Sequence, residues 1–174
     1  MTGLANRRHF GQYSLRLFEQ ARYNKEDLAC IMIDIDNFKQ VNDRFSHITG
    51  DCVIVMIGEL LKASIRQGDL CARFGGDEFI MLLQDCSATK AMQIAERIRH
   101  DFSHKTVEII KQSMEEDNAG WNSGDFTDKD INVLTGLSIG IASLMKNQPD
   151  NLEQLIKMAD KALYKAKQVG ETVM

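Results

Sequence analysis

The sequence has few of the residues that build covalent or metal-held scaffolds. Its 174 residues include one proline, one tryptophan and four cysteines, Cys30, Cys52, Cys71 and Cys86. The cysteines form no CxxC pair and have no paired histidines nearby, which argues against a zinc site or a disulfide framework. Three of them lie in or beside apolar stretches, as small buried hydrophobes do in a reducing compartment. We expect a single domain, residues 1–174, without a proline-rich linker.

Long apolar runs and an excess of positive charge are also missing. No run approaches the roughly 20 residues that cross a bilayer, and the first ten residues lack the apolar core of a signal peptide, so we expect a cytoplasmic protein. The chain has 21 lysines and arginines against 25 aspartates and glutamates, a net charge of −4. This balance excludes an extended nucleic-acid partner. It leaves room for a phosphate ligand that is held through a metal ion.

Hydrophobic spacing predicts helices in four segments. Apolar residues recur at helical spacing in stretches that begin near Asn6, Gly50, Ala91 and Leu152. Asn6 and Asp51 are suitable N-cap residues for the first two helices. Asn151 and Gln154 form an approximate capping box for the last one.

Continuous apolar runs predict strands between these helices. Leu28–Asp34 reads as a buried strand, and residues 71–84 read as strand, tight turn and return strand. Glycines within the strand-like stretch Val133–Ser143 predict the close approach of another backbone. In residues 103–132, helical spacing from Val107 to Met114 precedes a polar, acidic stretch that we expect to be a long exposed loop. The mixture predicts an α/β or α+β domain with helices covering a central sheet.

Two acidic clusters follow apolar strands. Asp34 and Asp36 end the first strand on one face, and Asp77 and Glu78 lie at the tip of the predicted hairpin. If the two strands are neighbours, these carboxylates converge at one edge of the sheet and need a cation between them. A metal site that offers carboxylate oxygens and no histidine or cysteine ligand favours Mg²⁺ or Mn²⁺. The geometry suits phosphoryl or nucleotidyl transfer.

The same residues carry a resemblance to a known family. Six segments resemble, in order, the motifs of the GGDEF family of diguanylate cyclases: residues 2–8 (TGLANRR), 34–43 (DIDNFKQVND), 47–51 (HITGD), 73–79 (RFGGDEF), 137–142 (LSIGIA) and 159–167 (ADKALYKAK). The resemblance implies a mostly antiparallel sheet with helices on both faces, similar to the palm of nucleotide cyclases and polymerases. It also implies the condensation of two GTP molecules into cyclic di-GMP with release of pyrophosphate.

The resemblance also assigns residues to the reaction. Asp34 and Asp77 would bind two Mg²⁺ or Mn²⁺ ions together with the backbone carbonyl of Ile35. Glu78 would assist the metal or deprotonate the attacking hydroxyl, and the roles of Asp77 and Glu78 are not separable by sequence. The substrate contacts would come from Asn42 and Asp51 at the guanine and from Phe38, Lys39, Gly75, Gly76 and Lys167 around the phosphates.

Arg66 and Asp69 lie at the spacing of the family's inhibitory RxxD site, where an arginine holds the product, and Arg97 would add a second contact. The chain departs from the family pattern at Ser46, which replaces a glycine, at Glu171, which replaces an arginine, and in the long segment 103–132.

One site holds one GTP, so catalysis requires a homodimer with two-fold symmetry. We expect an attached sensory or regulatory domain to bring the two copies together. Two alternatives remain at this stage: a catalytically weak module that binds GTP or cyclic di-GMP and signals to a partner, and a cyclase that uses another nucleotide.

Overall fold

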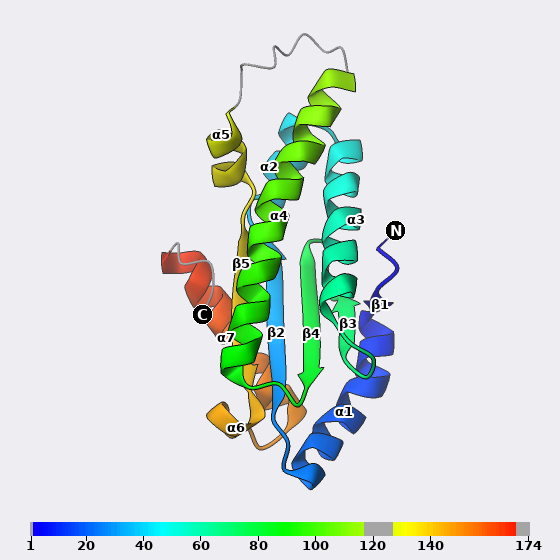
Figure 1. The fold of residues 1–174 in the computed structure, drawn as a ribbon, viewed down its shortest axis with the longest axis vertical. Helices are drawn as coiled ribbons and strands as arrows, with labels where there is room; N and C mark the ends of the chain where they lie inside the picture. The colour runs from blue at the N-terminus through cyan, green and yellow to red at the C-terminus, as the bar shows by residue number, and fades with distance from the viewer. Residues whose placement is uncertain (1, 117–126, 170–174) are drawn as a thin grey trace.

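The computed structural model describes residues 2–116 and 127–169, which build a five-stranded sheet (Figure 1). The strands are β1 (Ala5–Asn6), β2 (Leu28–Ile35), β3 (Leu70–Arg73), β4 (Glu78–Gln84) and β5 (Leu137–Ser143). Their order in the sheet is β1-β3-β4-β2-β5. β1 pairs with β3 in parallel, and the pairs β3–β4, β4–β2 and β2–β5 are antiparallel. The expected, mostly antiparallel sheet is confirmed.

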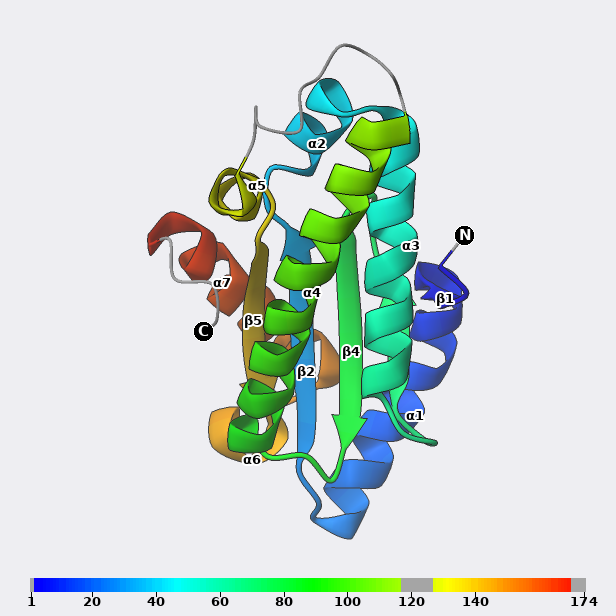
Figure 2. The same ribbon diagram turned by 45° about the horizontal axis from the view of Figure 1, so that its top comes forward.

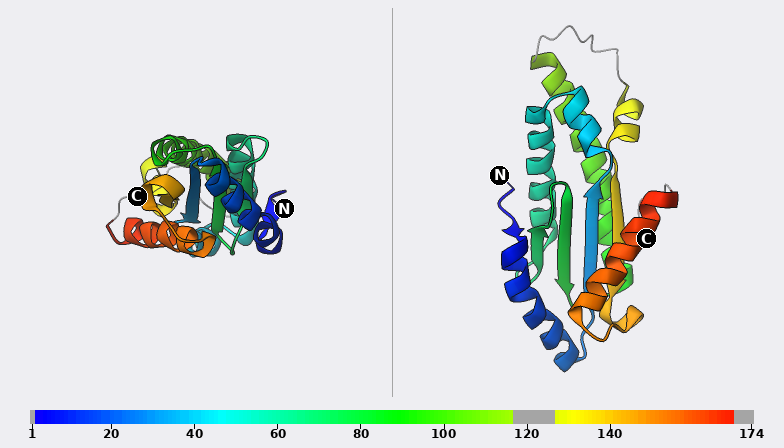
Figure 3. Two further views of the ribbon diagram at one scale, coloured as in Figure 1. Left: turned by 90° about the horizontal axis from the view of Figure 1, so that it is seen from below. Right: turned by 180° about the vertical axis from the view of Figure 1, so that it is seen from behind.

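Helices cover both faces of this sheet. α3 (His47–Ser64) and α4 (Ala88–Glu116) lie on one face, and α1 (Arg7–Asn24) and α7 (Leu152–Val169) lie on the other (Figures 1 and 3). Three short helices complete the described fold: α2 (Phe38–Arg44), α5 (Asp128–Leu134) and α6 (Leu144–Asn147).

The two helical layers explain why β2 is apolar without a break. All eight residues of β2 are buried. Ile31 and Ile33 pack into a core with residues of α3 and α4, whereas Cys30 and Met32 pack into a second core with residues of α1 and α7. Alternate side chains of a strand point to opposite faces, so a strand covered on both sides needs apolar residues at every position.

The helix boundaries confirm two predicted caps and correct a third. Asn6 accepts a hydrogen bond from the His9 N–H at 2.9 Å and begins α1. Asn151 accepts one from the Gln154 N–H at 2.9 Å at the start of α7. The expected start of α3 at Gly50 and Asp51 is wrong.

The helix α3 begins at His47, because the Ser46 hydroxyl accepts the Thr49 N–H at 3.1 Å and serves as the cap. Asp51 therefore lies exposed inside the helix, not at its end.

The segment 103–132 is largely helical where the structure describes it. α4 continues without interruption to Glu116, which confirms and extends the helical spacing from Val107 to Met114. The expected long loop, residues 115–130, is wrong at both of its described ends. Residues 115 and 116 belong to α4, and Thr127 and Asp130 form a capping box that begins α5. Residues 117–126, the middle of the expected loop, lie outside the described residues.

The cysteines behave as the composition predicted. Cys30, Cys71 and Cys86 are buried and unpaired, and Cys52 is exposed. Burial raises the pKa of the Cys30 thiol and of the Cys71 thiol to about 12, so both stay protonated. No helix within the described residues is long and apolar enough to cross a membrane.

Candidate active site

The two acidic clusters meet where β2 and β4 lie side by side. Asp34 on β2 pairs in register with Glu78 on β4, and it pairs with Ser138 on the other side. The Ile35 N–H donates a hydrogen bond to the Asp77 carbonyl at 3.2 Å. The fold therefore brings together two clusters that are 43 positions apart in the sequence, because the condition that β2 and β4 are neighbouring strands is met.

Asp34 is the most enclosed of these carboxylates. It is 6% exposed, and its Oδ1 lies 2.8 Å from the Nζ of Lys167, which α7 brings to the sheet edge. Burial raises the pKa of Asp34, and the hydrogen bond and charge of Lys167 oppose that rise. The charges of Asp77 and Asp36 raise the pKa further. This carboxylate thus lies in an environment that favours a neighbouring cation.

Asp36 is held by groups that sequence reasoning did not single out. Its Oδ1 accepts a hydrogen bond from the Ser138 hydroxyl at 2.6 Å. Gly136 leaves space for the other oxygen, Oδ2, which would lie 2.7 Å from a Cβ at that position. Burial raises the pKa of Asp36, and the hydrogen bond from Ser138 lowers it. Ser138 belongs to the LSIGIA segment, so a polar residue inside an apolar strand was the signal that could have found it.

The turn between β3 and β4 lies against the Glu78 side chain. The Phe74 and Gly75 N–H groups donate to the Glu78 carbonyl at 2.8 and 3.2 Å, which closes the turn. A Cβ on Gly75 would lie 2.6 Å from the Glu78 Oε2, whereas one on Gly76 would meet nothing within 4 Å. A side chain at position 75 would therefore displace the Glu78 carboxylate from its present position, and Gly76 leaves the backbone accessible to a ligand.

The residues expected at the guanine and the phosphates include four on the adjoining helices α2 and α3. A Cβ on Gly50 would lie 1.9 Å from the Asn42 Oδ1 and 3.3 Å from the Phe38 ring, so both side chains rest against the first turns of α3. Asp51 follows Gly50 directly and is exposed. Lys39 is exposed on the first turn of α2.

The acidic edge provides oxygen donors but no complete metal cage. Within residues 2–116 and 127–169, no group of three or more histidine, cysteine, aspartate or glutamate side chains is placed to hold a metal by itself. Magnesium commonly takes one or two carboxylates from the protein and completes its shell with water and substrate phosphates. The all-oxygen donor set at Asp34 and its neighbours fits that arrangement, and it does not fit a metal held by protein ligands alone.

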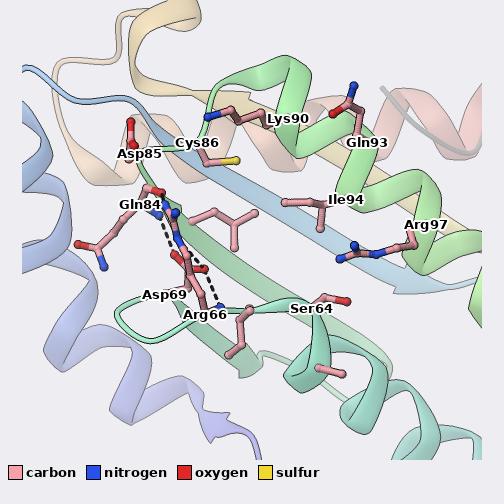
Figure 4. A pocket seen from close by; sticks show the side chains of 13 residues that line it. Ser64, Arg66, Asp69, Gln84, Asp85, Cys86, Lys90, Gln93, Ile94 and Arg97 are labelled. Carbon is pink, nitrogen blue, oxygen red and sulfur yellow. Dashed lines mark hydrogen bonds and ion pairs between the residues drawn. The ribbon is translucent and has the colours of Figure 1, made fainter.

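The predicted RxxD site is a separate cavity between β4 and the start of α4. Arg66, Asp69 and Arg97 all line it, and its volume is about 510 Å³ (Figure 4). Asp69 accepts hydrogen bonds from the backbone N–H of Arg66 at 3.0 Å and from that of Gln84 at 2.9 Å. Its side chain therefore also fixes the local backbone. The Arg66 side chain is 61% exposed, and the Arg97 side chain points into the same space from α4.

A mostly antiparallel sheet between two helical layers, with carboxylates at adjoining strand ends, defines a domain of the nucleotide-cyclase palm class. The chain belongs to the GGDEF family: it matches the family described as "Diguanylate cyclase, GGDEF domain" over residues 1–124 and 120–172.

Two similar proteins cover most of the chain, and one of them is named as a diguanylate cyclase. The chain is 37% identical over 146 residues to diguanylate cyclase A of Treponema denticola, which covers 84% of the chain and 34% of that protein. It is 38% identical over 174 residues to the protein YhcK of Bacillus subtilis, which covers 98% of the chain and 42% of that protein. The chain thus spans less than half the length of these relatives.

Solved structures share the fold over nearly the whole chain. The active GGEEF domain of a diguanylate cyclase from Vibrio cholerae superposes with a TM-score of 0.73 at 31% identity, covering 98% of this chain and 95% of that one. The GGDEF domain of DgcB from Caulobacter crescentus, solved with c-di-GMP, gives a TM-score of 0.79 at 26% identity, with 98% and 90% covered.

Proposed function

We propose that the chain is the catalytic domain of a diguanylate cyclase, which condenses two GTP molecules into cyclic di-GMP and two pyrophosphates. The observation that carries the proposal is the register of Asp34 with Glu78, beside Asp77, at the edge where β2 and β4 adjoin. An acidic edge of this kind suits a substrate that brings phosphates and a metal. The cyclase relatives and the neighbour bound to c-di-GMP support the same reading.

The base and the phosphates would be bound by different parts of the site. Asp51 accepts hydrogen bonds from N–H groups of guanine, and Asn42 donates to its O6, a pattern that suits adenine less well. Lys39 and Lys167 supply positive charge to the phosphates, and the Gly75 and Gly76 backbone allows their close approach.

In the reaction, the 3′-hydroxyl of one GTP attacks the α-phosphorus of the other. A P–O bond forms, the bond to pyrophosphate breaks, and the hydroxyl proton passes to Asp77 or Glu78. Two such steps close the ring, so the two GTP molecules must be held face to face by two copies of the chain in a C₂ arrangement.

We also propose that Mg²⁺ or Mn²⁺, two per site, binds at Asp34, Asp77, Glu78 and the carbonyl of Ile35. When bound, the metal neutralises charge on the phosphates. The chain's own contribution is to gather the carboxylates and to bring Lys167 to Asp34, where its ammonium limits their mutual repulsion. An attached sensory or regulatory domain and a cytoplasmic location are further parts of this proposal.

Incubation of the protein with GTP and Mg²⁺, followed by chromatography of the products, tests the activity. We expect cyclic di-GMP and pyrophosphate in a 1:2 ratio, with a specific rate that rises with protein concentration because two copies are required. GTP binding by calorimetry without turnover at high protein concentration would support the binding module instead. Faster turnover of ATP than of GTP would support another nucleotide.

The RxxD cavity is proposed to bind the product and inhibit the enzyme. Replacing Arg66 by alanine is expected to raise the inhibition constant for cyclic di-GMP at least tenfold, because a charge-assisted contact to phosphate or guanine is lost. Arg66 is the better choice for this test than Asp69, whose carboxylate holds the backbone of Arg66 and Gln84. Arg99→Ala removes the same charge from α4 outside the cavity and serves as the control. Equal inhibition of both variants and of the parent would exclude Arg66 from the product site.

A further inference from the structure

The segment that departs from the family pattern packs against the corner between α2 and α3. Val107 and Ile110 on α4 and Ile131 on α5 form a small apolar cluster. Phe45, at the end of α2, packs both on this cluster and on the main core. The upper part of α4 runs beside α2 and α3 at this point (Figure 2). The contact therefore joins the segment 103–132 to the corner between α2 and α3, the two helices that carry the proposed guanine-binding residues.

A chain of hydroxyl groups makes a second, polar connection. The Thr49 hydroxyl lies 3.0 Å from the Ser46 hydroxyl and 2.5 Å from the Ser113 hydroxyl on α4. Thr49 is 1% exposed, so these partners satisfy a group that water does not reach. Ser113 is 64 positions away in the sequence and reaches the first turn of α3 from outside it.

The backbone at this corner needs support. Ser46 has φ 151° and ψ 163°, a region that residues with a side chain rarely adopt. Such a conformation persists only where its surroundings determine it. Here the Ser46 hydroxyl accepts the Thr49 N–H at 3.1 Å, and Thr49 in turn contacts Ser113.

The corner sets how the two proposed guanine-binding residues lie relative to each other. Asp51 is two residues after Thr49 on the same helical turn. Asn42 lies on α2 and rests against Gly50. A shift of the turn at Ser46 would therefore move Asp51 relative to Asn42.

We propose that α5 and the end of α4, from Val107 to Glu116, form a brace that positions Asn42 and Asp51 for the base, and that Ser113 is a positioning residue which acts through Thr49. This inference rests on the proposed function and extends it. The contacts of the brace are made to Phe45 and Thr49, and within the described residues none of them is to Asp34, Asp77 or Glu78. We therefore expect it to govern base affinity and base discrimination and to leave the chemical step alone.

The test compares Ser113→Ala with the parent chain and with Ser103→Ala. Ser103 is also on α4, and its hydroxyl donates to the His100 carbonyl outside the brace. Ser113→Ala is expected to raise KM for GTP about fivefold and to change kcat less than twofold, because one partly buried hydrogen bond is lost. Its preference for GTP over inosine triphosphate, which lacks the 2-amino group, should fall. Ser113→Thr, which keeps a hydroxyl, should restore both, and Ser103→Ala should match the parent.

Two further measurements keep the outcomes separate. Calorimetric Kd values for GTP show whether the parent chain binds the nucleotide. If the parent shows neither binding nor turnover, the proposed function is overturned and the brace with it. If the parent binds GTP and Ser113→Ala has the same Kd, KM and base preference, the brace is overturned and the proposed function stands. Hydrogen exchange at residues 46–51 should be faster in Ser113→Ala than in Ser103→Ala, and equal exchange would also overturn the brace.

Discussion

Replacing Asp77 or Glu78 by alanine is expected to reduce the formation of cyclic di-GMP by at least about a thousandfold, because several kcal/mol of transition-state stabilisation depend on the acidic edge. Glu78 pairs in register with Asp34, so its removal takes away one of the carboxylates that converge there. Asp77 lies in the same turn, and its carbonyl accepts the Ile35 N–H, a bond that the alanine variant keeps. The loss should therefore reflect chemistry and not the position of the strand.

The measurement is the initial rate of product formation at saturating GTP and Mg²⁺, together with a thermal melt. Glu19→Ala on α1 removes an exposed carboxylate away from the acidic edge and is the matched control, expected to keep the parental rate. Both active-site variants should melt within a few degrees of the parent, because neither side chain is part of a buried core. Turnover that survives both substitutions would remove the acidic edge from the mechanism.

Local patterns were sufficient to predict the elements that build the site. The apolar run that ends in Asp34 predicted β2, and Gly75 and Gly76 between apolar runs predicted the hairpin; both are confirmed. These features follow from side-chain alternation and turn chemistry, which act over a few residues. The order of strands in the sheet does not follow from such patterns, because it depends on which apolar faces pack together. The sequence could therefore predict that the two acidic clusters converge only on the condition that their strands are neighbours.

The parts that were missed depend on longer-range contacts. The family motif assigned Lys167 to the phosphates, but its pairing with Asp34 joins residues on α7 and β2 and was not predicted. The start of α3 was misplaced because Asp51 is a good cap by residue type. Ser46, the actual cap, requires a backbone conformation that a sequence pattern would not assign to serine.

Replacing Gly140 by alanine is expected to destabilise the domain by about 3 kcal/mol or more, lowering its melting temperature by roughly 10 °C. Gly140 lies in the middle of β5 under α7. A Cβ there would lie 2.1 Å from the Leu163 nitrogen and 2.2 Å from the Ala159 carbonyl oxygen. Both atoms belong to the helix backbone and cannot rotate away. This is the close approach of another backbone that the glycines of this strand predicted, and it is confirmed at this position.

The same contact links packing to the active site. α7 carries Lys167, so a helix pushed away from β5 would draw the ammonium from Asp34. Any folded fraction of the Gly140→Ala variant should then bind GTP more weakly than the parent. Gly11→Ala on α1 is the matched control: its Cβ would meet nothing within 4 Å, and alanine should stabilise the helix by about 0.5–1 kcal/mol. Equal melting temperatures for the two variants would show that α7 can move away from β5 at little cost, and that Gly140 is not what fixes Lys167 at the sheet edge.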